Sequence, residues 1–204
     1  MAKDRYFYFN KVKDYKDLKA TVTIVGLEGT GSVLAEILVR SGFNLRIIDK
    51  GRVYKEELQS QSVFIEEDVT KFKAKQAKKR LEAINPDVKI KAFHEELTPE
   101  TIYLLDADVI VDCTNSQVVS KMIHDYSLKQ EIPCIFVGAT DTKVNILVQN
   151  SKDISSKLKD YDVLEKGVLG STTYTAAGLI SSLVYKLLKD EKVKDSYVLD
   201  VDNF

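Results

Sequence analysis

The sequence predicts an α/β fold with a doubly wound, mostly parallel sheet and helices on both of its faces. This prediction rests on residues 21–49. A β-branched apolar run at 22–25 is typical of a buried parallel strand, and apolar residues recur at helical spacing from 30 to 40. Glycines separate the two segments, and a second apolar run at 45–48 ends on Asp49. This order of strand, glycine turn, helix, strand and acid is the outline of a Rossmann-like, mononucleotide-binding βαβ unit.

The glycine turn is the expected anion site. Backbone N–H groups at a helix start, together with the helix dipole, suit a phosphate, and glycines let the main chain approach it. Asp49 can accept hydrogen bonds from ribose hydroxyls. The usual dinucleotide fingerprint has glycines at the positions of Gly26, Glu28 and Gly31, and the middle one here is glutamate. Because a carboxylate repels a pyrophosphate, nucleotide binding in general is favoured over a nicotinamide or flavin dinucleotide. A βαβ crossover without a ligand is the alternative.

Length and composition predict one domain over residues 1–204, with residues 1–19 as an N-terminal arm that carries an aromatic run. The chain is 44% hydrophobic and 30% charged, an ordinary globular balance. A net charge of −1 gives no electrostatic argument for nucleic acid or a membrane. No apolar run reaches the length of a membrane span, and the first ten residues do not resemble a signal peptide. We therefore expect a cytoplasmic protein.

The few sulfur and imidazole groups indicate no metal site. Cys113 and Cys134 each lie in an apolar, strand-like run and are expected to be buried core thiols. With no CxxC pair and only His94 and His124 beside them, a zinc site is not expected.

The remaining elements alternate as the fold class requires. Thr70 is expected to cap a helix at 71–84, with Pro86 beyond its end. The polar segment 151–166 is expected to be an excursion from the domain. Further strands are expected at 88–93, 109–111, 132–137, 144–148 and 197–201, and further helices at 99–105 and around 119–126. The segment GVLGST is expected to lead into a last helix with an apolar stripe from 176 to 187.

The order of these motifs resembles the E1-like adenylating superfamily, which includes the bacterial sulfur-carrier activators for molybdopterin and thiamine synthesis. The resemblance covers most of the chain. It lies in the GLEGTGS loop, Asp49, RVYKEELQSQSVF, DVTKFKAKQAKKRLEAINPDV, DCTNS and GVLGS. A narrower similarity, in length and lysine content, is to the E1-like adenylating protein of the iron-guanylylpyridinol cofactor pathway.

The resemblance implies a homodimer that binds ATP and Mg²⁺ and converts a carboxylate into an acyl adenylate with release of pyrophosphate. Lys73 matches the lysine that contacts the phosphates, Asp49 the ribose acid and Gln61 the glutamine that closes the pocket. Arg5 resembles an N-terminal arginine that reaches the partner subunit's site. With Lys73 and Arg5, Asn115 completes the implied catalytic set. The implied nucleotide site comprises Gly26, Glu28, Gly29, Thr30, Gly31, Asp49, Lys50, Gln61, Lys73, Thr114 and Asn115.

The sequence departs from the superfamily at several site positions. Ser60 stands where an arginine is expected, Glu57 where an asparagine is expected, and Asn115 where a Mg²⁺-binding aspartate is expected. Asn115 still offers an amide oxygen to a metal but no charge. An ATP-binding scaffold or regulatory subunit without chemistry is therefore one alternative function. An NAD(P)-dependent oxidoreductase is a second, although Glu28 speaks against it.

The substrate class also stays open at this point. The carboxylate belongs either to a small molecule, such as a pyridinol carboxylate, or to a protein tail. A downstream partner protein that forms a thioester is a further expectation. Neither nucleic acid nor a membrane is expected as a partner.

Overall fold

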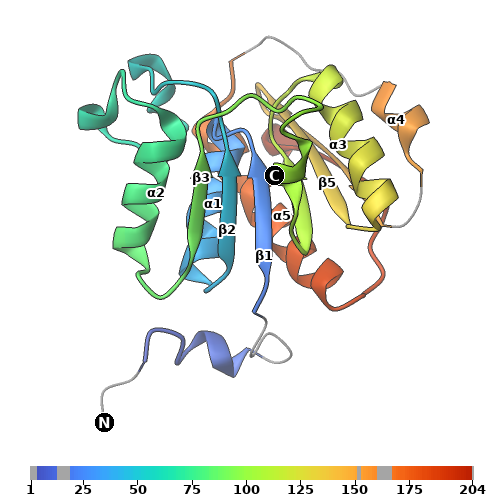
Figure 1. Cartoon of the computed structure of the whole chain (residues 1–204), viewed down its shortest axis with the longest axis horizontal. Helices are drawn as coiled ribbons and strands as arrows, with labels where there is room; N and C mark the ends of the chain where they lie inside the picture. Colours follow the sequence, from blue (N-terminus) through green and yellow to red (C-terminus); the bar gives the residue numbers. More distant parts are fainter. Residues whose placement is uncertain (1–3, 13–18, 151–152, 160–166, 204) are drawn as a thin grey trace.

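The strands form one sheet whose order confirms the doubly wound, mostly parallel architecture. A computed structural model of the chain describes residues 4–12, 19–150, 153–159 and 167–203. Its seven-stranded sheet has the order β3-β2-β1-β4-β5-β6-β7 (Figure 1). The parallel strands are β1 (Thr21–Val25), β2 (Asn44–Ile48), β3 (Ile90–Phe93), β4 (Val109–Asp112) and β5 (Cys134–Thr140), and β6 (Lys143–Gln149) and β7 (Ser196–Asp200) continue the sheet antiparallel.

Helices cover both faces of the sheet (Figure 1). One face carries α1 (Gly29–Arg40), α2 (Lys73–Ile84) and α5 (Gly170–Leu188), and the other carries α3 (Gln117–Gln130), α4 (Ser155–Lys159) and the 3₁₀-helix η4 (Ile102–Leu105). Four further 3₁₀-helices are η1 (Phe9–Lys11), η2 (Lys55–Glu57), η3 (Glu66–Asp68) and η5 (Val201–Asn203).

The central strands are apolar along their length because both of their faces are buried. In β1, Ile24 packs into the core under α1 and α5, while its neighbour Val25 packs into the core under α3. In β4, Val111 and Ile110 alternate between the same two cores. Successive side chains of a strand point to opposite faces, so a strand covered on both sides reads as a continuous apolar run.

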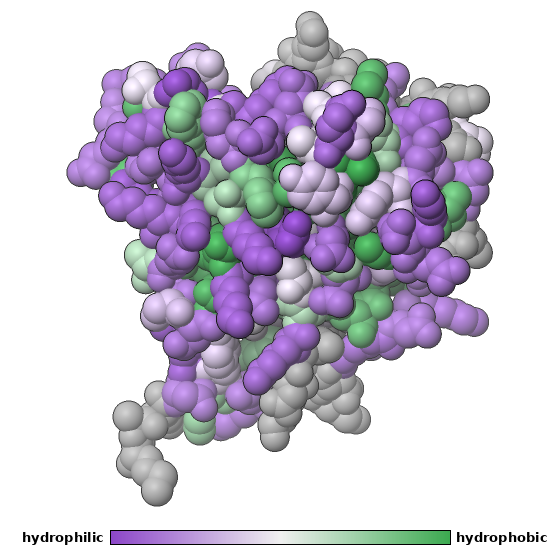
Figure 2. Space-filling view, viewed as in Figure 1, coloured by the Kyte–Doolittle hydropathy of each residue, from purple (hydrophilic) through white to green (hydrophobic). Residues whose placement is uncertain are grey.

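One face of the molecule (Figure 2) illustrates how the charged residues, 30% of the chain, are distributed. Hydrophilic side chains dominate the face in Figure 2, and only small apolar patches lie between them. None of the helices in the described part of the chain combines the length and the apolarity that crossing a bilayer requires.

The start of α2 differs from the sequence expectation of a helix at 71–84 capped by Thr70. The helix begins at Lys73, and Thr70 has a left-handed backbone with φ 70°. The reason is a backbone pairing with the loop after β2: Thr70 N donates to Val53 O at 2.8 Å, and Lys73 N donates to Gly51 O at 3.0 Å. These bonds hold residues 70–72 outside the helix.

Other boundaries shift by a few residues. The third strand begins at Ile90 rather than at 88, and β5 runs from Cys134 to Thr140 rather than from 132 to 137. Of the excursion expected at 151–166, residues 153–159 are described and include α4, whereas 151–152 and 160–166 lie outside the described residues.

Asn85 fastens the N-terminal arm to the end of α2. Its side chain is fully buried, and its Nδ2 donates to Val39 O and to the Tyr6 hydroxyl, both at 2.7 Å. Its Oδ1 accepts from Asp87 N at 3.1 Å. The Tyr6 ring in turn lies against Gly42, which follows the end of α1 and has a φ of +92°. The INPD motif therefore has a structural role, since it joins two helix ends and the arm.

We predict that Asn85→Ala lowers the free energy of unfolding by about 3 kcal/mol, because it leaves buried hydrogen-bonding groups without partners. Chemical denaturation followed by circular dichroism measures this loss. Asn10→Ala, an exposed asparagine of the same arm, is the control and is expected to change stability little. A loss as small for Asn85→Ala as for the control would contradict this role.

Candidate functional site

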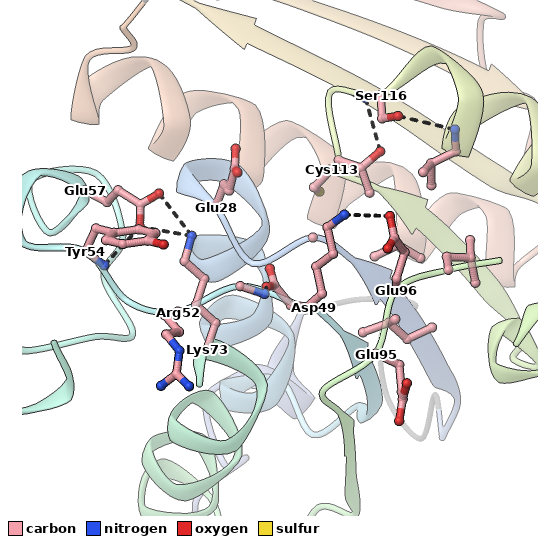
Figure 3. Close-up of a pocket in the computed structure, with 18 residues that line it drawn as sticks. Glu28, Asp49, Arg52, Tyr54, Glu57, Lys73, Glu95, Glu96, Cys113 and Ser116 are labelled. Carbon is pink, nitrogen blue, oxygen red and sulfur yellow. Dashed lines mark hydrogen bonds and ion pairs between the residues drawn. The ribbon is translucent and has the colours of Figure 1, made fainter. Parts of the chain in front are cut away.

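A cavity of about 280 Å³ lies where the parallel strands end (Figure 3). Gly26 after β1, Asp49 after β2, Glu96 after β3 and Thr114 after β4 all line it. The strand order reverses between β1 and β4, so the cavity occupies the topological switch point at which open α/β sheets bind ligands. A smaller cavity beside it is lined by Glu28, Gly29, Thr30 and Asn115 among others.

The glycine turn brings the start of α1 unusually close to β1 and β4. A Cβ atom at Gly31 would lie 2.0 Å from Gly26 O, and one at Gly26, whose φ is +89°, would lie 2.7 Å from Cys113 O. Both positions therefore exclude a side chain. The first-turn amides of α1 have no acceptor within their own helix, and Gly29 and Thr30 line the smaller cavity. This arrangement presents N–H groups to an anion.

Asp49 holds the glycine turn against the loop after β2. One carboxylate oxygen accepts from Leu27 N at 2.7 Å, and the other accepts from Gly51 N at 2.6 Å. Each carboxylate oxygen has a second lone pair, so the group can still accept a hydrogen bond from the hydroxyl of a ligand in the cavity.

Lys73 ends in the cavity although it belongs to the lysine-rich helix α2. Its side chain is only 4% exposed, unlike the solvated lysines around it. Its ammonium lies 3.0 and 3.2 Å from the two carboxylate oxygens of Glu57, which comes from η2 (Figure 3). The resemblance implied that Lys73 contacts the phosphates, and in the structure Lys73 lines the same cavity as Asp49 and Glu28.

Glu28 lies on the border of the two cavities and lines both. Its pKa is raised above the ordinary value, because the surrounding walls desolvate the charge and the Glu57 and Asp49 carboxylates repel it, while Lys73 acts in the opposite direction. The side chain remains accessible from the open cavity. The cavity wall contains more carboxylates than cations, so an anionic ligand meets both attraction and repulsion there.

The segment after β4 is organised by hydrogen bonds to the buried carboxylate of Asp112. The Asp112 carboxylate accepts from Thr114 N at 2.9 Å, from the Thr114 hydroxyl at 2.7 Å and from Ser120. Asn115 follows with a left-handed backbone, φ 51°, and lines the smaller cavity. Within the described ranges, no group of three His, Cys, Asp or Glu side chains is placed to hold a metal ion.

Two expected site residues, Gln61 and Arg5, lie differently from what the resemblance implies. Gln61 is 2% exposed and is absent from the described walls of both cavities. Arg5 lies at the far end of α2, where it donates to Ile84 O at 2.7 Å and pairs with Asp87 at 3.4 Å. Lys50 does line the main cavity, paired with Glu96. The proposed roles of Gln61 and Arg5 stay predictions.

The sequence analysis did not identify several residues that line the main cavity. Glu95 and Glu96 follow β3, and the rule that ligands gather at the carboxyl ends of strands was a signal for them. Arg52 and Tyr54 lie in the irregular loop after β2, where periodicity gives no signal. The Arg52 guanidinium stacks over Phe72, 4.1 Å from its centroid, and points away from Glu57 (Figure 3).

Fold and site together define an α/β protein of the doubly wound class, with a glycine turn and a buried lysine at the switch-point cavity. A family model described as the ThiF family matches residues 6–203, and the chain belongs to that family.

Two curated relatives are sulfur carrier protein ThiS adenylyltransferases. The one from Bacillus subtilis (strain 168) is 30% identical over 84% of this chain and 52% of its own length. The one from Escherichia coli (strain K12) is 31% identical over 61% of this chain and 51% of its own length. The chain thus spans about half the length of these relatives. A crystal structure of E. coli MccB with ATP has a TM-score of 0.74 at 19% identity, over 89% of this chain and 64% of that one, which shows the shared fold.

Burial shields the two cysteine thiols. Cys113 is 5% exposed and Cys134 is fully buried, and desolvation, with the nearby Asp112 charge, raises the pKa of each thiol well above its usual range. Because the thiolate is the nucleophile, a thiol with a raised pKa stays protonated and unreactive at neutral pH.

We therefore predict that Ellman's reagent labels neither cysteine of the native protein at pH 8 within minutes. In 6 M guanidinium both thiols lose their burial and are expected to react fully, which serves as the internal control. Rapid labelling of Cys113 in the folded protein would show that the cavity it lines admits solvent and favours its thiolate.

Proposed function

We propose that this chain is an ATP-dependent adenylyltransferase that activates a carboxylate as an acyl adenylate. The observation that carries the proposal is the buried ammonium of Lys73 at the switch-point cavity, beside the glycine turn and Asp49. Family membership and the adenylyltransferase names of the relatives support it. The MccB structure with ATP shows that a protein of this fold holds the nucleotide.

In the proposed reaction, an oxygen of the substrate carboxylate attacks the α-phosphorus of ATP. The bond from that phosphorus to the bridging oxygen breaks, and pyrophosphate leaves with the bonding electrons. Because a carboxylate is a weak nucleophile, the protein contributes mainly by positioning and by stabilising charge. Asp49 orients the ribose, the first-turn amides of α1 bind phosphate, and Lys73 follows the charge that develops on the departing pyrophosphate.

Mg²⁺, which the resemblance implies, would neutralise phosphate charge. Mg²⁺ usually keeps several waters and is bound through one or two protein oxygens together with substrate phosphates. The described residues offer no prebuilt group of three ligating side chains, and Asp112 already accepts three hydrogen bonds. We propose that Mg²⁺ arrives with ATP, with the amide oxygen of Asn115 as a neutral ligand.

The substrate is proposed to be the carboxylate of a protein tail. The relatives named for their substrate act on the sulfur carrier protein ThiS, which supports this choice. A pyridinol carboxylate, followed by thioester formation on a partner protein, remains the narrower prediction from sequence and belongs in the same assay panel. A cytoplasmic location also stays a prediction.

The test is ATP–pyrophosphate exchange with a panel of carboxylates. We predict that Lys73→Ala lowers turnover at least ~100-fold, the scale for removing one transition-state electrostatic contact. ATP affinity, measured by calorimetry, is expected to fall much less because the glycine turn and Asp49 remain. Lys79→Ala, an exposed lysine of the same helix, is the control and is expected to retain activity.

The alternatives give different results in the same experiments. Equal turnover in Lys73→Ala and wild type would reject the catalytic role of the lysine. Tight ATP binding without exchange for any carboxylate would favour the scaffold or regulatory function. Thermal stabilisation by NAD and none by ATP would favour the oxidoreductase.

We further propose a homodimer in which Arg5 reaches the partner subunit's nucleotide. Within its own chain Arg5 docks at the end of α2 opposite the cavity, so its guanidinium has to leave Ile84 O and Asp87. Arg5→Ala is predicted to lower turnover about tenfold, the scale of one hydrogen bond to a charged group. Lys11→Ala, in the same arm, is the control. A monomer by light scattering at micromolar concentration would contradict the proposal.

A further inference from the structure

The ammonium of Lys73 is already occupied in the protein without a nucleotide. Both oxygens of Glu57 lie within 3.2 Å of it, and the lysine side chain is 4% exposed. A cation that is removed from water needs an anionic partner, because an unpaired buried charge is strongly destabilising. Glu57 supplies that partner from η2.

The same ammonium is the one that the proposed function assigns to the phosphates. An incoming polyphosphate meets the carboxylates of Glu28, Asp49 and Glu57 around Lys73. If Glu57 kept its place, the phosphates would gain little from Lys73 and would lie against a carboxylate at hydrogen-bond distance. The attraction between Lys73 and a phosphate and the repulsion between that phosphate and Glu57 therefore both favour replacement of Glu57 by the phosphate.

Glu57 can leave Lys73 without unfolding the loop that carries it. Among the described residues, the Glu57 side chain has one further hydrogen bond, a long one that it accepts from Tyr54 N at 3.3 Å. The loop itself is fixed elsewhere: the buried carboxylate of Asp68 accepts from Arg80 of α2 at 3.0 and 3.1 Å and from Ile65 N at 3.1 Å. The exchange thus needs only a change of side-chain rotamer.

We propose that Glu57 is an internal competitor of the nucleotide phosphates for Lys73, and that ATP binds by displacing it. This inference rests on the proposed nucleotide site. It makes Glu57 a specificity-determining residue, because only a ligand with enough negative charge near Lys73 can displace a carboxylate. Adenosine, which has no phosphate, gains nothing from the exchange.

The test is calorimetric titration of wild type, Glu57→Gln and Glu66→Gln with ATP and with adenosine, each with and without Mg²⁺. Glutamine keeps the shape and an oxygen acceptor but loses the charge. Glu66→Gln is the matched control, because Glu66 lies in the same loop and pairs with Lys55 on the exposed surface. Glu57→Gln is expected to bind ATP about tenfold more tightly than wild type, the scale of one charge-assisted hydrogen bond. Adenosine affinity is expected to be equal in all three proteins.

Other outcomes overturn the inference. An ATP affinity that is unchanged in Glu57→Gln rejects competition, and one that falls only with Mg²⁺ present makes Glu57 a metal ligand instead. An equal gain for adenosine assigns the effect to cavity shape. If no folded variant binds ATP, the proposed function fails as well, whereas ATP binding without the gain rejects the inference alone.

A second measurement needs no substitution. In a crystal structure of the wild-type protein with ATP, Glu57 is expected to have moved out of hydrogen-bond distance of Lys73, with a phosphate oxygen in its place. A pair that stays at 3.0 Å in that complex overturns the proposal, even if Glu57→Gln proves unstable.

Discussion

The carboxylate of Asp49 joins the two loops between which the cavity lies. By accepting from Leu27 N and Gly51 N, it sets the distance between the glycine turn after β1 and the irregular segment after β2. The position of Lys73 depends on this link, because Lys73 N donates to Gly51 O. One side chain therefore fixes the phosphate-binding turn, the start of α2 and the lysine that α2 delivers. Asp49 therefore has a structural role in addition to the ribose contact proposed for it.

Charge around the cavity is balanced by internal pairing. Lys73 faces Glu57, Lys50 faces Glu96, and the Arg52 guanidinium donates to Thr70 O and stacks on Phe72. Each cation of the wall is thus held by a group of the chain itself. In the proposed binding of an anionic nucleotide, the cations would exchange partners, and the net free energy of binding would be smaller than the sum of the new contacts.

Local patterns were enough to predict most of the strands and helices and the position of Asp49, whereas Lys73 was identified by the family resemblance. β-branched runs, helical spacing and the glycine turn act over a few residues, and the carboxyl ends of parallel strands must meet at one edge. Local patterns could not predict that α2 begins at Lys73, two residues later than expected, because this start depends on backbone hydrogen bonds from Thr70 and Lys73 to residues 51–53. The ion pair between Lys73 and Glu57 and the hydrogen bond from Arg5 to Ile84 O also join residues that are distant in the sequence, so local patterns could not predict them.

The start of α5 packs against the first turn of α1. Thr173 of α5 donates to Ser60 O at 3.4 Å, and its methyl group would lie 2.5 Å from a Cβ at Gly29. Residues from both ends of the chain thus form one wall, and α5 covers α1 along its length. During synthesis on a ribosome, the glycine turn stays without this cover until the segment through residue 188 has emerged. The binding site is consequently among the latest parts of the protein to reach its final packing.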